Sequence, residues 1–134
     1  MMRTENGDNM KVSELVNEVN QEQELLQLCD KLCEDLTKLH LKQFPTLDWY
    51  GHRYKVSPKY IKIIVTEYGE DRSVWGFINK KEFQKGATGI TFECGDVLKA
   101  AGWKTPTLNA PRGNLFNGYD VTVGNRKYGP DYLI

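Results

Sequence analysis

The stretch from Gly102 to Asn114 gathers residue types suited to holding a phosphate-bearing ligand. Trp103 offers an aromatic face for stacking, and Lys104 offers a mobile positive charge. Arg112 supplies a planar fork for phosphate, and Asn114 an amide that can bind a base edge or a ribose hydroxyl. The same residues also suit a structural role, with the tryptophan in the core and the glycines and prolines shaping turns. Composition does not separate the two interpretations.

Signatures of catalytic machinery are missing from the sequence. It has no nucleophile elbow, no Gly-x-x-x-x-Gly-Lys-Ser/Thr loop and no His-Glu-x-x-His pair. His40 and His52 are the two histidines, and nothing close to either in sequence marks a nucleophile or a paired carboxylate. We therefore expect a protein that is not an enzyme and that needs no cofactor.

The three cysteines do not form a metal-binding pattern. Cys29 and Cys33 are four residues apart in a predicted helix, and Cys94 stands alone. Because no convincing further pair of ligands accompanies them, we expect no metal site. Buried structural thiols are the simpler interpretation, and unpaired cysteines indicate a reducing compartment.

Length and charge limit the classes of function. The chain has 134 residues, the size of one domain, and its net charge is zero. Residues 1–48 hold five Lys or Arg and ten Asp or Glu, a net −5, whereas residues 49–134 hold thirteen and eight, a net +5. Either an acidic helix simply precedes a basic body, or the C-terminal part handles an anion. The dispersed charge makes nucleic acid an unexpected partner, and no apolar stretch is long enough for a membrane span.

Residues 12 to about 42 are predicted to be helical. One apolar line recurs at alternating steps of three and four, interrupted only by Glu22, and a second line widens the apolar surface in the C-terminal half. One helix of about 30 residues, or two with a break near Asn20 and Gln21, would fit. A helix with two apolar faces can bury one on its own sheet and the other on a second copy. We therefore expect a homo-oligomer through residues 12–42; complete coverage by the chain's own sheet is the alternative. The two lines are Val12, Leu15, Val19, Leu26, Cys29, Cys33, Leu36 and His40, and Leu25, Leu28, Leu32 and Leu39.

From residue 49 the apolar period changes to two, which predicts strands at residues 50–56, 60–66 and 73–78 in an antiparallel meander. Residues 80–89 are expected to be a polar loop, and residues 90–92 a short strand. Residues 95–100 open either a helical turn or a hairpin. Asn117-Gly118 predicts a two-residue hairpin turn.

These elements predict an α+β fold, an N-terminal helical arm followed by a small antiparallel sheet body. The expected division is a disordered tail at residues 1–10, a helical arm for assembly at 11–44 and a ligand-binding body at 45–134.

Three motifs resemble a group of small phage proteins of unassigned function. The motifs are RSVWGFIN at residues 72–79, GDVLKAAGWKTP at 95–106 and PRGNLF at 111–116. The resemblance covers about residues 50–120 and implies a bacteriophage origin.

A second resemblance is to the Thoeris anti-defence sponge proteins of phages. It is carried by Tyr60-Ile61-Lys62-Ile63, Phe77, Gly95-Asp96-Val97-Leu98 and Gly113-Asn114-Leu115, in that order. Members of that family form homo-oligomers through their helices and sequester cyclic ADP-ribose isomers; some bind cyclic oligonucleotides. The chain differs from them in its Trp103–Pro106 segment. The ligand-binding residues that the resemblance implies are Phe77, Trp103, Lys104, Arg112 and Asn114.

The resulting hypothesis is a phage anti-defence protein that sequesters a cyclic nucleotide immune signal in the host cytoplasm without turnover. Its partners would be a phosphate-bearing nucleotide and further copies of itself. The alternative is a phage accessory protein that binds a host protein through its acidic helical arm.

Overall fold

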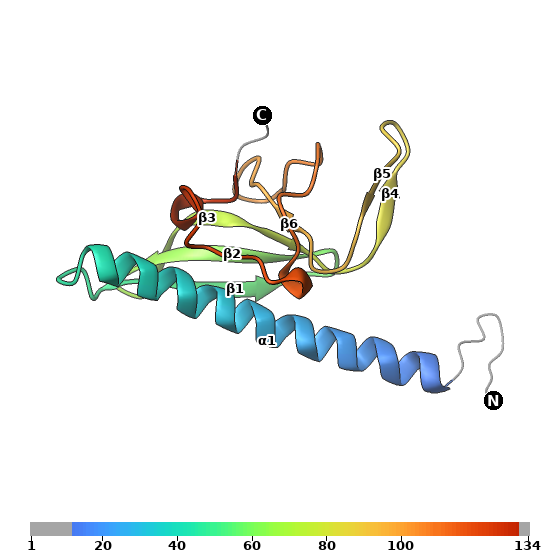
Figure 1. Ribbon diagram of the computed structural model, residues 1–134, viewed down its shortest axis with the longest axis horizontal. Helices are drawn as coiled ribbons and strands as arrows, with labels where there is room; N and C mark the ends of the chain where they lie inside the picture. The colour runs from blue at the N-terminus through green and yellow to red at the C-terminus, as the bar shows by residue number, and fades with distance from the viewer. Residues whose placement is uncertain (1–11, 132–134) are drawn as a thin grey trace.

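The structure, a computed structural model, describes residues 12–131, so the predicted tail at residues 1–10 lies outside the described residues. One long helix is followed by six strands and two short 3-10 helices (Figure 1). In chain order they are α1 (Val12–Gln43), β1 (Tyr50–Val56), β2 (Tyr60–Glu67), β3 (Glu70–Asn79), β4 (Phe83–Lys85), β5 (Ile90–Phe92), β6 (Val97–Leu98), η1 (Leu115–Asn117) and η2 (Arg126–Tyr128). The predicted α+β arrangement is confirmed.

α1 is a single continuous helix of 32 residues, which resolves the choice between one helix and two. Its C-terminal half packs on the sheet through an apolar face with the predicted spacing. The N-terminal half, residues 12–24, is exposed along its whole length and extends past the strands (Figure 1). We call residues 12–24 the projecting segment. The buried residues of α1 are Leu25, Cys29, Leu32, Cys33, Leu36 and His40.

The main sheet has four antiparallel strands in the order β1-β2-β3-β6. Strands β2 and β3 are joined by Tyr68 and Gly69, whose φ angles of 54° and 78° make the tight turn that matches strand twist. Two irregularities in the β2–β3 register, at Ile63/Ile64 and Val65/Thr66, lie within this hairpin. The predicted meander is confirmed.

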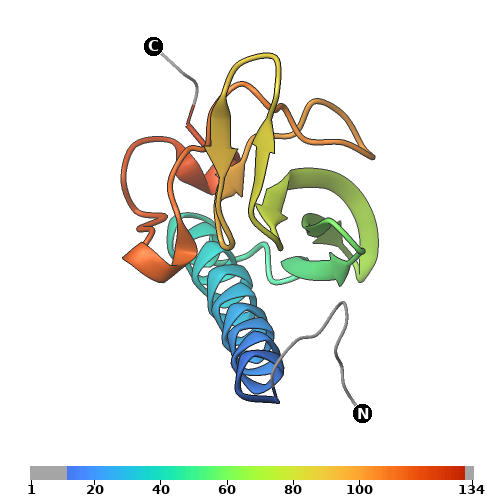
Figure 2. The same cartoon turned by 90° about the vertical axis from the view of Figure 1, so that its right-hand side faces the viewer.

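The sheet buries side chains on both faces. Its inner face packs with α1, and Ile61, Ile63 and Trp75 belong to this main core. On the outer face, Phe77, Phe92 and Leu98 form a second, smaller core. The hairpin of β4 and β5 stands out from the sheet (Figure 2) and supplies Phe92 to that core.

Two local predictions are wrong. Residues 80–89 are not all loop, because Phe83–Lys85 forms β4 and pairs with β5; Phe83 stacks on Phe92 at a centroid distance of 5.0 Å. Residues 115–121 do not form a hairpin around Asn117-Gly118. The side chain of Asn114 caps η1, and Gly118 ends it with a φ of 76°. The glycine therefore serves a helix end instead of a hairpin turn.

Residues 12–131 contain neither a candidate membrane span nor a candidate metal-binding cluster. No described helix is both long enough and apolar enough to cross a membrane. No group of three or more His, Cys, Asp or Glu among these residues could hold a metal ion.

Candidate functional site

The outer face of β1 and β2 carries a cluster of cations. Ile61 and Ile63 point into the main core, so Lys62 between them faces outward. Arg53 and Lys55, which alternate with inward-facing Tyr54, share that outer face. We call Arg53, Lys55, Lys62, Trp103 and Lys104 together the cationic face.

The strand register concentrates positive charge here. Lys55 and Lys62 lie directly opposite each other on neighbouring strands. Like charges in that position are destabilising in a sheet. The pKa of Lys62 is lowered, mainly by burial and then by Lys55, with smaller contributions from Lys104 and Arg53 and an opposing one from Asp71. An anion bound at this face would relieve the repulsion.

Trp103 is held over the cationic face by its loop. The Lys62 ammonium lies 4.5 Å from the centroid of the Trp103 ring. Backbone hydrogen bonds close the loop below it, from Thr107 N to Lys99 O at 2.7 Å and from Ala101 N to Thr105 O at 2.9 Å. Because the indole is still 46% exposed, one of its surfaces is accessible for stacking.

Arg53 is already paired on this face. Its Nε donates to Asp71 Oδ1 at 2.7 Å and its Nη2 to Asp71 Oδ2 at 2.6 Å. The pKa of Asp71 is lowered, and the hydrogen bonds from Arg53 are the main cause. This two-point pair fixes the guanidinium at the edge of the cationic face, so Lys55, Lys62 and Lys104 are the charges best placed for an anion.

Phe77 has a supporting position. It lies opposite Lys62 on β3 and is only 2% exposed, within the second core. The Phe77 and Tyr60 rings meet edge to face, with a distance of 6.2 Å between their centroids. Phe77 therefore lies beside Lys62 within the second core, and its ring presents almost no surface to a ligand.

Arg112 is committed to its own loop. Its Nη1 donates to Asn109 Oδ1 at 2.8 Å and to the Ala110 carbonyl at 2.7 Å. Its Nε donates to the Asp131 carbonyl at 3.0 Å. Burial lowers the pKa of Arg112. These bonds tie residues 109–112 to the C-terminal segment, which is a structural role for the guanidinium.

Asn114 is committed in the same way. Its amide nitrogen donates to the Cys94 carbonyl and to Asp96 Oδ1, both at 2.9 Å. Its amide oxygen accepts from Phe116 N at 2.8 Å. Asn114 and Arg112 line an open hollow of about 520 Å³. Arg112 Nε and Nη1 and both amide atoms of Asn114, however, make the hydrogen bonds described above to other residues of the chain.

Of the five predicted ligand-binding residues, the structure brings Trp103, Lys104 and Phe77 to the outer face and places Arg112 and Asn114 in the C-terminal loops.

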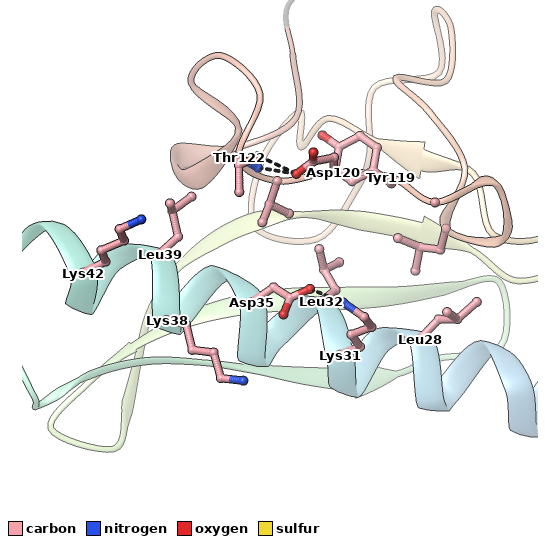
Figure 3. Close-up of a pocket in the computed structure, with 13 residues that line it drawn as sticks. Leu28, Lys31, Leu32, Asp35, Lys38, Leu39, Lys42, Tyr119, Asp120 and Thr122 are labelled. Atoms are coloured by element: carbon pink, nitrogen blue, oxygen red, sulfur yellow. Dashed lines mark hydrogen bonds and ion pairs between the residues drawn. The ribbon is translucent and has the colours of Figure 1, made fainter.

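A larger groove runs between α1 and the segment around η1. It has a volume of about 610 Å³; Leu32 and Leu39 on α1 point toward Tyr119–Thr122, and Leu28 also lines it (Figure 3). Lys31, Lys38 and Lys42 also line its helical wall. Lys31 is paired with Asp35 at 2.6 Å. The floor of the groove is therefore apolar. Its lining holds three lysines and two aspartates, Asp35 and Asp120.

Neither histidine is arranged as a general base. His52 Nδ1 lies 2.8 Å from the Thr37 hydroxyl, and burial, with a smaller effect of His40, lowers the pKa of His52 to about 4. His40 stacks on Tyr50 at a centroid distance of 3.5 Å. A base with a pKa near 4 is a weak proton acceptor at neutral pH. His52 therefore does little to make the Thr37 hydroxyl a better nucleophile.

Cys29 and Cys33 are protected thiols. Cys29 and Cys33 are buried in α1, and burial is the main cause that raises the pKa of each to about 12. A thiol with such a pKa is protonated at neutral pH and is a poor nucleophile.

Sequence reasoning missed Arg53, Lys55 and Lys62 as site residues. In the sequence, Arg53 and Lys55 alternate with Tyr54, and Lys62 lies between Ile61 and Ile63, so strand alternation puts the cations on the faces opposite those residues. Two features could not be predicted from the sequence. One is the strand register that places Lys55 opposite Lys62, and the other is the path of the loop that brings Trp103 over Lys62.

Comparison with known proteins gives one match. A family model described as "Family of unknown function (DUF7717)" matches residues 7–123. Neither the curated proteins nor the solved structures contain a significant match.

Proposed function

We propose that this chain, which belongs to the DUF7717 family of unknown function, binds a phosphate-bearing nucleotide at the cationic face without chemical turnover. The observation that carries the proposal is the position of Lys62, directly opposite Lys55 and under the ring of the exposed Trp103. A base stacks on the free indole surface, and the phosphate lies over Lys55, Lys62 and Lys104.

The biological setting of the proposal rests on the sequence resemblances. They suggest a phage protein that sequesters a cyclic nucleotide immune signal in the host cytoplasm. A binder of this kind needs affinity and abundance but no reacting group. The weakly basic His52 and the protonated buried thiols are consistent with a protein that holds its ligand unchanged.

Calorimetric titration with cyclic ADP-ribose isomers and cyclic dinucleotides tests the proposal. Stacking on an aromatic ring and a charge-assisted hydrogen bond each contribute on the order of 1–3 kcal/mol. Trp103→Ala and Lys62→Ala should therefore each weaken binding by about tenfold or more. Higher ionic strength should weaken binding as well, because the lysines are near the surface.

The matched control is Lys81→Ala, which removes an exposed lysine outside the cationic face and should leave the affinity unchanged. Wild-type protein that binds none of these nucleotides would contradict the proposal. So would an affinity that neither Trp103→Ala nor Lys62→Ala alters.

A further inference from the structure

The projecting segment presents an apolar surface that no other part of residues 12–131 covers. Val12, Leu15, Val16 and Val19 are 77%, 53%, 49% and 50% exposed. Their spacing of three and four residues places them along one side of the helix. Apolar residues scattered singly on a surface are ordinary, but a row of four on one helix side indicates a contact surface.

The groove between α1 and Tyr119–Thr122 has the chemistry that would cover this row. Its floor includes Leu28, Leu39 and Val121, and Lys38 and Lys42 lie one helical turn apart on its wall. From residue 12 to residue 30 the helix has five acidic residues and no Lys or Arg. Glu14 and Glu18 are likewise one turn apart, so each surface joins an apolar strip to a row of opposite charge.

The dimensions agree with such a contact. The helical wall of the groove, from Leu28 to Lys42, is about 21 Å long at a rise of 1.5 Å per residue. The apolar row from Val12 to Val19 is about 10 Å long on the same basis. The row therefore fits within the length of the groove.

The segment cannot reach the groove of its own chain. The projecting segment and the helical wall of the groove are parts of one continuous helix, α1 (Val12–Gln43). A straight helix cannot fold back on itself, so the row is open to the groove of another molecule and not to the groove of its own chain.

We propose that the projecting segment of one copy docks in the groove of a second copy, with Glu14 and Glu18 facing Lys38 and Lys42 of the neighbour. The segment and the groove are different patches, so the contact is either reciprocal across a two-fold axis, which gives a dimer, or head-to-tail, which gives a ring where the rotation between copies permits closure. The contact uses none of the residues of the cationic face and does not depend on nucleotide binding.

Charge reversal on each surface tests the proposal. Light scattering of the wild type at micromolar concentration should give a multiple of the 15.4 kDa chain mass. Glu14→Lys/Glu18→Lys and Lys38→Glu/Lys42→Glu should each be monomeric, because like charges then face each other in every contact. An equimolar mixture of the two double variants should assemble again, since the reversed segment fits the reversed groove and the two unchanged surfaces fit each other.

A matched pair of valines tests the apolar part of the contact. Val19 and Val123 are both 50% exposed, and Val123 lies outside the groove lining and the projecting segment. Val19→Asp should reduce the mass to that of one chain, whereas Val123→Asp should leave the assembly intact. Circular dichroism should show that all variants are folded.

Three results would overturn the proposal. They are a monomeric wild type, an assembly that survives Val19→Asp, and a mixture of the charge-reversed variants that stays monomeric. A monomeric wild type whose projecting segment binds a host protein would assign this surface to another partner.

Discussion

Replacing Leu36 with aspartate is expected to abolish folding of the chain. Leu36 is fully buried at the centre of the contact between α1 and the sheet. The substitution removes apolar burial and places a carboxylate without a partner in the core, which together cost more than about 4 kcal/mol. Natural domains have roughly 5–15 kcal/mol of stability, so most of it would be lost. Far-ultraviolet circular dichroism and urea unfolding should show an unfolded or barely folded chain.

The control for this prediction is Val16→Asp. Val16 is on the same helix but is 49% exposed in the projecting segment. Its replacement should change the free energy of unfolding of an isolated chain by about 0.5 kcal/mol or less. A cooperative, native-like unfolding transition for Leu36→Asp would contradict the described packing of α1.

Arg112→Ala is expected to lower thermal stability and to leave nucleotide binding unchanged. The substitution removes three hydrogen bonds, to Asn109, Ala110 and Asp131. Because the side chain is partly exposed, we expect a loss of about 2 kcal/mol, or a decrease in melting temperature on the order of 7 °C. Arg112→Lys should restore only part of it, since an ammonium cannot reproduce the fork.

Arg72→Ala is the control for Arg112→Ala, because Arg72 is exposed and has one ion pair, to Glu67 at 3.2 Å. It should have almost no effect on the melting temperature. An unchanged melting temperature for Arg112→Ala, together with weakened nucleotide binding, would instead make Arg112 the anion ligand that the sequence suggested.

The sequence predicted the elements whose signal is periodic. The apolar spacing along α1 identified the residues that pack on the sheet, and the alternation in β1 to β3 identified the meander. It did not show that only the C-terminal half of α1 is covered, because the same spacing continues through Val12, Leu15 and Val19. The period of the apolar residues shows that a helix has an apolar face. It does not show which part of the protein, or which partner, covers that face.

The irregular C-terminal part was harder to predict for a physical reason. Asn117-Gly118 is compatible with a hairpin turn, but the side chain of Asn114 caps η1 and selects the helical turn instead. The functional expectation for Arg112 and Asn114 met the same difficulty. A polar side chain on a loop can serve a ligand or the loop itself, and only the positions of its partners decide between them.

The most direct measurement for the nucleotide-binding proposal is mass spectrometry of small molecules released by heating the purified protein. The protein should be purified from cells in which cyclic nucleotide signalling is active. Wild type should release a phosphate-bearing nucleotide in an amount comparable to the protein, and Trp103→Ala should release about tenfold less. Wild type that releases no nucleotide, or Trp103→Ala that releases as much as wild type, would contradict binding at the cationic face.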